Sequence, residues 1–503
     1  MTMKHNYLAI DIGAESGRTI VGALDGDQLT LTETHRFANG PVRVPDGLHW
    51  DVLRLWSDIK EGIRKSSLQF GHTLDSVGLD TWAVDFALLD KNNSLLSDPF
   101  HYRDARTDGM LNEAFHRMPR AEIFANTGIQ FMQINTLYQL LAMSIHRSPL
   151  FDIAKTFLTI PDLFNYWLSG EITNEFTNAT TTQCFDPLKR DWATQVLTAM
   201  EVPSHLFGPV ADPGIQIGTL LPSIAEETGA GAIPIVLPAC HDTGSAVVAV
   251  PAPAGNQDFA WLSSGTWSIM GAEVQEPSLS EKALEYNFTN EGGVFGTWRL
   301  SKNIMGLWLV QECRREWMRA GDEISFDALT QFAAESEAFI SVIDPDVDEF
   351  IHPGDMPGRI QKFCADTNQR VPQTKGQILR VVLESIALKY RLVLERLEEL
   401  TGKRFDPIHI IGGGTKNKLL NQFAADSTGR TVVAGPVEAT AIGNILMQSI
   451  GMKHLGSLAD AREIASASFE PEIYEPRQNA EWAEAYSRLQ NSSNDFSRSA
   501  KSD

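Results

Sequence analysis

The tripeptide His241-Asp242-Thr243 has the residue types for acid–base chemistry. It follows the apolar run 233–237, which is typical of a buried strand, and precedes the small-residue segment 244–249, which can begin a helix. Ligands bind at the carboxyl ends of strands in α/β folds. A carboxylate there can take a proton from a substrate hydroxyl. Asp242 could instead be a helix N-cap, a common use of Asp before small residues.

Two turns rich in small residues lie on either side of this tripeptide in sequence. Each joins a predicted strand to a second strand: 7–13, turn 14–18 and 19–24 in the first case, and 259–262, turn 263–266 and 267–271 in the second. Successive backbone N–H groups in such turns form an anion-binding concavity. Either turn alone could be a tight hairpin that needs glycine. As a pair, they predict a duplicated domain that grips a polyphosphate.

A third glycine cluster, Gly412-Gly413-Gly414, follows the apolar strand 408–411 and leads into a predicted helix at 418–426. Three glycines let the backbone approach a ligand closely because no Cβ intervenes. A flat group such as an adenine ring suits that position. Neither the dinucleotide-binding fingerprint nor the G-x-x-x-x-G-K-[ST] loop, both of which join a strand to a helix, occurs in the chain.

This ordered set resembles the FGGY family of carbohydrate kinases, which is part of the actin, hexokinase and heat-shock ATPase superfamily. The resemblance spans roughly residues 7–475, and within the family it favours the branch that phosphorylates L-rhamnulose. Further segments that carry it are 80–86, 102–107, 135–140, 178–183, 290–293, 302–309 and 435–440. It implies an α/β fold with two duplicated actin/hexokinase-like (ribonuclease H-like) domains and a cleft between them.

The resemblance also implies a division of the chain. An N-terminal domain, 1–250, would bind the sugar and carry the catalytic base at its end. A C-terminal domain, 257–475, would bind the nucleotide. The proline-rich segment 250–256 predicts a linker, and the apolar spacing from Gly376 to about Leu400 predicts a long helix. The polar residues 487–503 predict a flexible tail.

Roles for individual residues follow from the resemblance. Asp242 would be the general base, and Asp11 would hold Mg²⁺, commonly through water. The phosphate-contacting positions would be Ala14, Glu15, Ser16, Gly17, Arg18 and Thr266. Gln311 and Gly413 would bind the nucleotide. The sugar-binding positions would be Ala83, His241, Asp242, Thr243 and Asn303.

The implied reaction is ATP-dependent phosphorylation of the terminal hydroxyl of a ketose. L-rhamnulose is the favoured substrate, and another ketose such as L-fuculose is the alternative. Phosphoryl transfer needs mainly positioning and charge neutralisation, and Mg²⁺ is usually held by one or two carboxylates plus phosphate oxygens.

The sequence departs from the family pattern at two positions. Ala83 stands where a glycine is usual, and its methyl group would trim the sugar pocket. Glu15 stands where a small residue is expected. We expect Glu15 to point outward because phosphates would repel its carboxylate.

Several of these residues have plainer alternatives. His241 could be a buried histidine satisfied by the backbone, and Asp11 a hydrogen-bond acceptor at a strand end. Trp82 could serve core packing, while Asp80 and Asp85 could be satisfied structural carboxylates. A non-catalytic ATP-binding protein of the same superfamily is a second functional class. A glycosidase with paired carboxylates is a third, which would leave the two phosphate-type turns unexplained.

Composition sets outer limits. A chain of 503 residues, 43% of them hydrophobic, can form two domains with substantial cores. A net charge of −22 argues against nucleic-acid partners, whose phosphates need a basic face, and against anionic membranes. Four widely spaced cysteines indicate neither a zinc site nor a disulfide framework. With no signal-peptide pattern or membrane-length apolar stretch, we expect a cytoplasmic enzyme. Family analogy suggests a monomer or homodimer.

Overall fold

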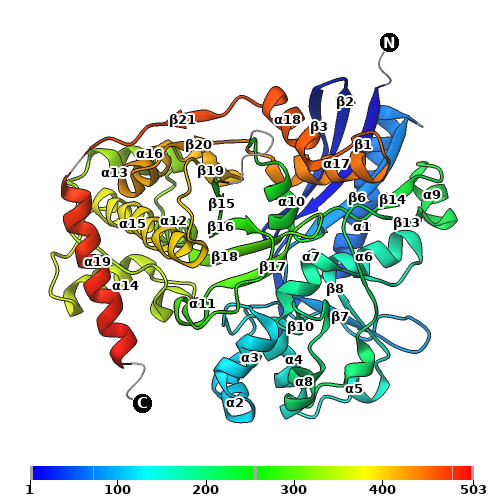
Figure 1. The fold of residues 1–503 in the computed structure, drawn as a ribbon, viewed down its shortest axis with the longest axis horizontal. Helices are drawn as coiled ribbons and strands as arrows, with labels where there is room; N and C mark the ends of the chain where they lie inside the picture. Colours follow the sequence, from blue (N-terminus) through cyan, green and yellow to red (C-terminus); the bar gives the residue numbers. More distant parts are fainter. Residues whose placement is uncertain (1–3, 72, 253–257, 479, 500–503) are drawn as a thin grey trace. The chain divides into compact units, whose positions relative to one another are not determined.

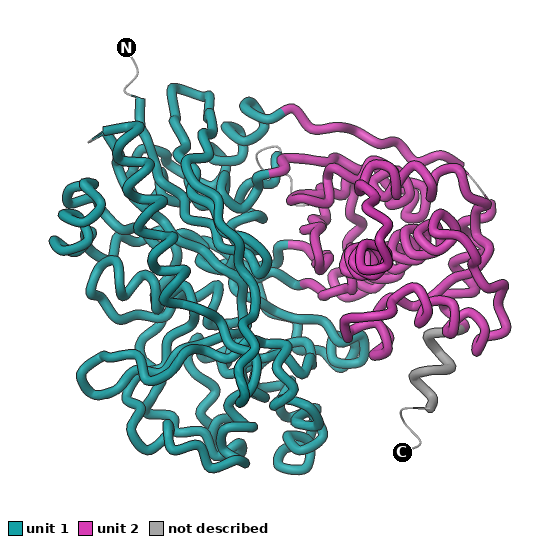
Figure 2. The backbone as a smooth tube through the Cα atoms, turned by 180° about the vertical axis from the view of Figure 1, so that it is seen from behind, with its two compact units in different colours: residues 1–256, 273–300, 438–469 teal, residues 257–272, 301–437, 470–503 magenta. Residues whose placement is uncertain are grey.

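The computed structural model describes residues 4–71, 73–252, 258–478 and 480–499. The chain divides into two compact units, each built from three separate segments (Figure 2). Unit 1 comprises Met1–Asn256, Glu273–Leu300 and Glu438–Phe469, and unit 2 comprises Gln257–Ala272, Ser301–Val437 and Glu470–Asp503.

The predicted division at 250/257 is therefore incomplete. Segments 273–300 and 438–469 were assigned to the second domain, yet they belong to unit 1. The physical reason is burial, because helix α17 (Ala439–Gly451) packs on strands β1 and β6 of unit 1. Part of the predicted linker, residues 253–256, lies outside the described residues.

Unit 1 is organised around a six-stranded sheet in the order β13-β14-β6-β1-β2-β3. The bounds of these strands are β1 His5–Ile12, β2 Ser16–Asp25, β3 Gln28–Ala38, β6 Leu74–Thr81, β13 Gln216–Thr219 and β14 Pro234–Val236. Strands β1, β2 and β3 form an antiparallel meander, whereas β6 runs parallel to β1 and β14 runs parallel to β6. The predicted first strand-turn-strand is confirmed.

Helices cover this sheet (Figure 1), and both α1 and α17 contact β1, which is buried along almost all its length. A strand covered on both faces reads as a near-continuous apolar run. The helices of unit 1 are α1 Val52–Phe70, α2 Met110–Arg117, α3 Arg120–Thr127, α4 Thr136–Ile145, α5 Leu150–Ile153, α6 Ile160–Ser169, α7 Phe176–Ala179, α8 Thr194–Ala199, α9 Pro222–Thr228, α10 Asp242–Val248, α11 Glu281–Tyr286, α17 and α18 Leu458–Ser468.

Smaller strand pairs complete unit 1. Their bounds are β4 Pro41–Val44, β5 Gly47–Trp50, β7 Phe86–Leu89, β8 Thr156–Thr159, β9 Asn174–Glu175, β10 Phe185–Asp186, β11 Asp191–Trp192 and β12 Val210–Ala211.

The second large sheet has the order β17-β18-β16-β15-β19-β20-β21. Its strands are β15 Ala260–Ser264, β16 Trp267–Val274, β17 Thr289–Gly292, β18 Trp298–Met305, β19 Ile408–Ile411, β20 Val432–Ala434 and β21 Glu472–Tyr474. Strand β17 and the part of β18 up to Leu300 belong to unit 1, in its segment 273–300. An antiparallel hairpin, β15–β16, is again followed by two parallel neighbours, β19 and β20. The two sheets thus share the topology that a duplication predicts.

The helices of unit 2 are α12 Trp308–Arg319, α13 Phe326–Glu335, α14 Met356–Asp366, α15 Lys375–Thr401, α16 Lys418–Thr428 and α19 Ala480–Ser499. Helix α15 confirms the predicted long helix. The predicted tail 487–503 is wrong at its start, because α19 continues through those residues to Ser499. Leu489 is fully buried there, and Arg488 donates to the Phe339 carbonyl at 2.7 Å. The polar composition of this segment gave no sign of this buried anchor.

Candidate functional site

Three carboxylates gather at one edge of the unit 1 sheet. Strands β1 and β6 run parallel, and their register pairs Asp11 with Asp80. Thr81 at the end of β6 forms a bridge to His241, which brings the start of α10 to the same edge. Asp242 is the first residue of α10. The predicted strand-end location of Asp11 and Asp242 is therefore confirmed.

The two oxygens of Asp242 have different surroundings. Oδ1 accepts from the Thr243 backbone N–H at 2.5 Å and from the Thr243 hydroxyl at 3.1 Å. It also lies 3.3 Å from Nε2 of His241. Oδ2 has no hydrogen-bond partner in the described part of the chain, and the side chain is 31% exposed. The N-cap of α10 is His241, so the N-cap alternative for Asp242 is wrong.

The neighbouring carboxylates change the proton affinity of this edge. Burial raises the pKa of Asp242; His241 opposes this effect and Asp11 adds to it. Burial also raises the pKa of Asp80 well above its usual range, with Asp11 adding to the shift and the Asn444 hydrogen bond opposing it. A base whose pKa lies closer to the working pH is a more effective proton acceptor.

The predicted phosphate turn lies between β1 and β2 and is closed by the Gly13 N–H, which donates to the Ser16 carbonyl at 3.0 Å. Glu15 is exposed, as expected. Arg18 donates to Asp11 Oδ2 through Nε at 3.0 Å and Nη2 at 2.7 Å, and it also pairs with Glu438. Arg18 thus couples the turn to the carboxylate edge.

The carboxylate oxygens at this edge are suitable ligands for a hard divalent cation. Asp80 Oδ1 is buried and lacks a hydrogen-bond partner in the described structure, and only Oδ2 of Asp11 accepts from Arg18. Carboxylate oxygens are ligands that Mg²⁺ prefers. Asp11, with Asp80 beside it, could hold such an ion.

A separate cluster, His5, Asp75 and His454, also brings potential ligand atoms within 4.8 Å of one another. It lies where β1 and β6 begin, at the opposite end of these strands from Asp11. Its two imidazole rings are stacked with centroids 3.6 Å apart. Nearly parallel rings cannot direct in-plane lone pairs at one ion, so the cluster is not arranged as a metal site.

Ala83, one of the predicted sugar-binding positions, lies in a segment whose backbone is hydrogen-bonded to the end of β1. The Trp82 N–H donates to the Ile12 carbonyl at 3.2 Å, at the end of β1. Val84 has φ of 67°, which is strained for a β-branched residue. Such strain often accompanies functional sites because the surrounding structure must enforce it.

Asp85, the next residue, is the centre of a buried hydrogen-bond network. It accepts from the indole N–H groups of Trp50 at 2.6 Å and Trp82 at 3.0 Å, and from the Gln139 amide at 2.9 Å. Burial raises its pKa to about 6, with these hydrogen bonds opposing the rise. The plainer interpretations of Trp82 as a core residue and Asp85 as a satisfied carboxylate are confirmed.

His241 is held by side chains that the sequence did not single out. Nδ1 of His241 lies 3.0 Å from Nη2 of Arg299 and 3.4 Å from Oε2 of Glu291. The alternative of a histidine satisfied by the backbone is therefore wrong. Glu291 lies in a segment that carries the family resemblance. For Arg299, the available signal was a charged residue between the apolar residues Trp298 and Leu300.

In unit 2, the second small-residue turn is fixed to the start of α12. The Leu307 N–H donates to the Gly265 carbonyl at 3.0 Å, and the Trp308 N–H donates to the Thr266 carbonyl at 3.1 Å. Helix α12 carries Gln311, whose Oε1 is buried without a hydrogen-bond partner in the described structure. An unsatisfied buried acceptor suits a ligand that brings a donor.

The triple-glycine loop follows β19, the parallel neighbour of β15. A Cβ on Gly414 would lie 2.0 Å from Oγ of Ser264, so this loop can approach the end of β15 only as glycine. Gly413 is exposed, with open space at its Cβ position. The predicted nucleotide residues of unit 2 thus lie on adjoining elements.

The predicted site residues fall into two groups. Unit 1 holds residues 14–18, Asp11, Ala83, His241, Asp242 and Thr243, whereas unit 2 holds Thr266, Asn303, Gln311 and Gly413. Asn303, a predicted sugar residue on β18, therefore belongs to a different unit from the other sugar-binding positions.

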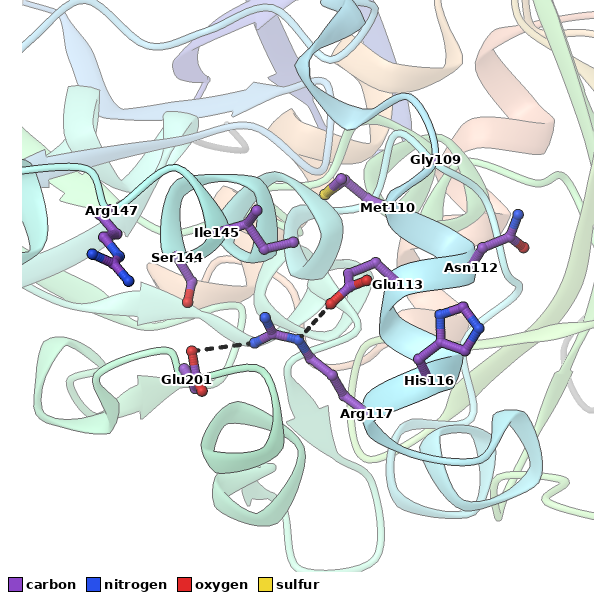
Figure 3. Close-up of a pocket in the computed structure, with 10 residues that line it drawn as sticks. All are labelled: Gly109, Met110, Asn112, Glu113, His116, Arg117, Ser144, Ile145, Arg147 and Glu201. Atoms are coloured by element: carbon purple, nitrogen blue, oxygen red, sulfur yellow. Dashed lines mark hydrogen bonds and ion pairs between the residues drawn. The ribbon is translucent and has the colours of Figure 1, made fainter.

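A pocket of about 480 Å³ in unit 1 is lined by none of the predicted residues (Figure 3). Arg117 lies between Glu113 at 3.1 Å and Glu201 at 3.4 Å, so its charge is already neutralised. No chemistry is assigned to this pocket.

Two family models match the chain. The model of the FGGY carbohydrate kinase N-terminal domain matches residues 6–249, and that of the C-terminal domain matches residues 260–452. The chain belongs to the FGGY family of carbohydrate kinases. The predicted family and enzyme class are confirmed, and the family implies ATP as co-substrate.

The relatives extend over nearly the whole chain. It is 42% identical to a rhamnulokinase of Bacteroides thetaiotaomicron, with 97% of this chain and 99% of that protein covered. It is also 42% identical to a rhamnulokinase of Oceanobacillus iheyensis, over 94% of this chain and 98% of that protein.

Solved structures show the same fold at low identity. A gluconate kinase from Lactobacillus acidophilus matches with a TM-score of 0.80 and 15% identity, covering 99% of this chain and 98% of that chain. The predicted two-domain α/β fold is confirmed. Among the described helices, none is long and apolar enough to cross a membrane.

Proposed function

We propose that this kinase transfers the γ-phosphoryl group of ATP to the terminal hydroxyl of L-rhamnulose, giving L-rhamnulose 1-phosphate. The observation that carries the chemistry is the Asp242 carboxylate: among the described residues, Oδ2 has no hydrogen-bond partner, whereas Thr243 and His241 lie against Oδ1. The 40–42% identity to four rhamnulokinases supports the choice of sugar.

In this proposal Asp242 Oδ2 removes the proton of the hydroxyl as it attacks. His241, Thr243, Ala83 and Asn303 bind the sugar. Residues 14–18, Thr266, Gln311 and Gly413 bind the nucleotide. Asp11, with Asp80 beside it, holds Mg²⁺, which when bound neutralises phosphate charge. Arg18 restrains the Asp11 carboxylate, which fixes its orientation before ATP arrives.

The test is coupled ADP release with ATP and Mg²⁺ across L-rhamnulose, L-fuculose, L-ribulose, D-xylulose, D-ribulose and glycerol. We expect preferred turnover of L-rhamnulose and a loss of at least about 10²-fold in kcat for Asp242→Asn. Asp90→Asn is the matched control, because Asp90 only accepts backbone N–H groups in a turn. Turnover of a different ketose with none of L-rhamnulose would refute the substrate, and an active Asp242→Asn enzyme would refute the base.

A further inference from the structure

A line of three side chains runs from the interior of unit 1 to the Asp242 carboxylate. Arg299, which is 1% exposed, places Nη2 3.0 Å from Nδ1 of His241. On the other side of the ring, Nε2 of His241 lies 3.3 Å from Oδ1 of Asp242. None of the roles implied by the family includes Arg299.

The donor inventory assigns the tautomer of His241. A guanidinium group has donors only, so an Arg299 N–H directed at Nδ1 requires that nitrogen to accept. The proton of the neutral imidazole is then on Nε2, facing Asp242. Oδ1 therefore receives three donors, two from Thr243 and one from His241, and Oδ2 is turned away from all of them.

We propose that Arg299 is a positioning residue for phosphoryl transfer, which holds His241 in the Nε2–H tautomer so that Asp242 keeps Oδ2 for the sugar hydroxyl. The proposal rests on the proposed function, in which Asp242 is the base. The proposal gives the buried Arg299–Glu291 ion pair a role in catalysis, which packing alone would not require.

Glu291 explains why an arginine is required at this place. Its Oε2 lies 3.2 Å from Nη2 of Arg299 and 3.4 Å from the same Nδ1 of His241. Burial favours a neutral Glu291, but the pKa of Glu291 is lowered, with the Arg299 charge as the main opposing cause, so Glu291 is a carboxylate. Without Arg299, that carboxylate would attract a proton to Nδ1 and reverse the tautomer. An unprotonated Nε2 would then face Asp242 Oδ1 and repel it.

The geometry of Arg299 itself is fixed. Its Nε donates to the Gly292 carbonyl at 2.9 Å, next to Glu291 on β17. Two neighbouring points on one strand thus orient the guanidinium. The charged and titratable groups that face Asp242 are Asp11 from β1, Asp80 from β6, Arg299 from β18 and the adjoining His241.

The experiment compares Arg299→Met, the double variant Arg299→Met/Glu291→Gln, Arg299→Lys and wild type. The double variant removes the unpaired buried carboxylate, which alone would destabilise the fold, and supplies an amide that can donate to Nδ1. Arg462→Met is the control, because Arg462 pairs with Glu273 and donates to the Val247 carbonyl of α10. Its loss removes a largely buried ion pair and a contact to α10 but leaves the Arg299–His241 contact in place. The first readout is ¹⁵N NMR of histidine-labelled enzyme, with His241 assigned by His241→Gln.

We expect the His241 proton on Nε2 in wild type and in Arg462→Met, and on Nδ1 in Arg299→Met. In Arg299→Met, kcat should fall by about 10²-fold or more, as a wrong histidine tautomer does elsewhere, with KM for ATP unchanged. The acidic limb of the kcat–pH profile should move to higher pH, because ionised Asp242 loses a hydrogen bond. Arg299→Lys and the double variant should recover part of both losses.

An unchanged tautomer in folded Arg299→Met, or a wild-type proton on Nδ1, would overturn the proposal. So would a kcat loss in Arg299→Met no larger than that in Arg462→Met. The NMR readout needs no turnover, so it still decides the tautomer if L-rhamnulose proves not to be the substrate.

Discussion

The reactivity proposed for Asp242 depends on an asymmetry within one carboxylate. Thr243 and His241 approach Oδ1, and each of these contacts favours the ionised form. Burial and Asp11 favour the protonated form, and together they prevail. Asp242 therefore binds a proton more readily than an ordinary aspartate.

This balance predicts the acid side of the pH profile. The base must be ionised to accept a proton, so kcat/KM should fall as pH decreases through the raised pKa of Asp242. The midpoint should lie above ~3.9, the usual value for aspartate. Initial rates with excess coupling enzymes would measure it. A midpoint at or below that usual value, in enzyme shown to remain folded, would contradict the pKa shift.

The hydrogen bonds of Asp85 should contribute to the stability of the fold. Asp85→Asn would place an amide N–H₂ at one of the two oxygen positions, facing either the Gln139 donor at Oδ1 or the Trp50 and Trp82 donors at Oδ2, and would leave buried donors unpaired. We expect the free energy of unfolding to fall by about 1–3 kcal/mol at pH 7, measured by urea denaturation. Asp90→Asn, in an exposed turn, should change it by less than about 0.5 kcal/mol.

The pH dependence of this difference has a definite sign. The pKa of Asp85 in the folded protein, about 6, is above the unfolded value of ~3.9. The stability that this shift contributes is fully present below the unfolded pKa and is lost as pH rises through 6. The gap between wild type and Asp85→Asn should therefore narrow from about pH 4 to pH 6. A gap that widens over this range would refute the shift.

Among the elements, the placement of α10 decides where Asp242 stands. Helix α17 lies against α10 so closely that a Cβ on Gly443 would be 1.7 Å from the Ser245 carbonyl oxygen. On its sheet side, α17 donates from Asn444 to Asp80 at 2.5 Å and from Gln448 to the Leu8 carbonyl at 3.1 Å. It therefore supports both α10 and the carboxylate edge.

Gly443→Ala should separate these two helices and displace Asp242. We expect stability to fall by about 1–3 kcal/mol and kcat to fall by about 10-fold or more, since small misplacements are costly in catalysis. Gly62→Ala is the matched control. Gly62 lies on α1, and its added Cβ would contact the Thr19 side chain of β2 and not α10. Equal kcat in the two variants, each corrected for folded fraction, would show that α10 does not depend on this contact.

Local patterns predicted the elements that local sequence determines. The strand-turn-strand of β1 and β2 and the helix α15 follow from period and turn chemistry, and both were found as expected. The arrival of Arg299 beside His241 could not be predicted, because a hairpin return brings it from another segment. For the same reason, the packing of α17 on the unit 1 sheet could not be predicted, because its apolar face does not indicate which sheet it covers.

The whole molecule is interlaced, since unit 1 is completed only by segments 273–300 and 438–469. A fragment of residues 1–256 would lack α17 and expose the sheet face that Ile442, Ile445 and Leu446 bury. We expect this fragment to show no cooperative thermal unfolding by circular dichroism. Joining the two missing segments to it through Gly/Ser linkers should restore cooperativity. Cooperative unfolding of 1–256 alone would contradict the division into interlaced units.

The interlacing also sets an order of events during synthesis. Residues 1–256 leave the ribosome long before Phe469, the end of the third segment of unit 1. At ~5–20 residues per second, that interval lasts on the order of 10–40 s. During it, β1 and β6 have no α17 to cover them, and their apolar surface is open to chaperones and to aggregation. The nascent chain thus completes the support of its carboxylate edge only after the first two segments of unit 2 have already been made.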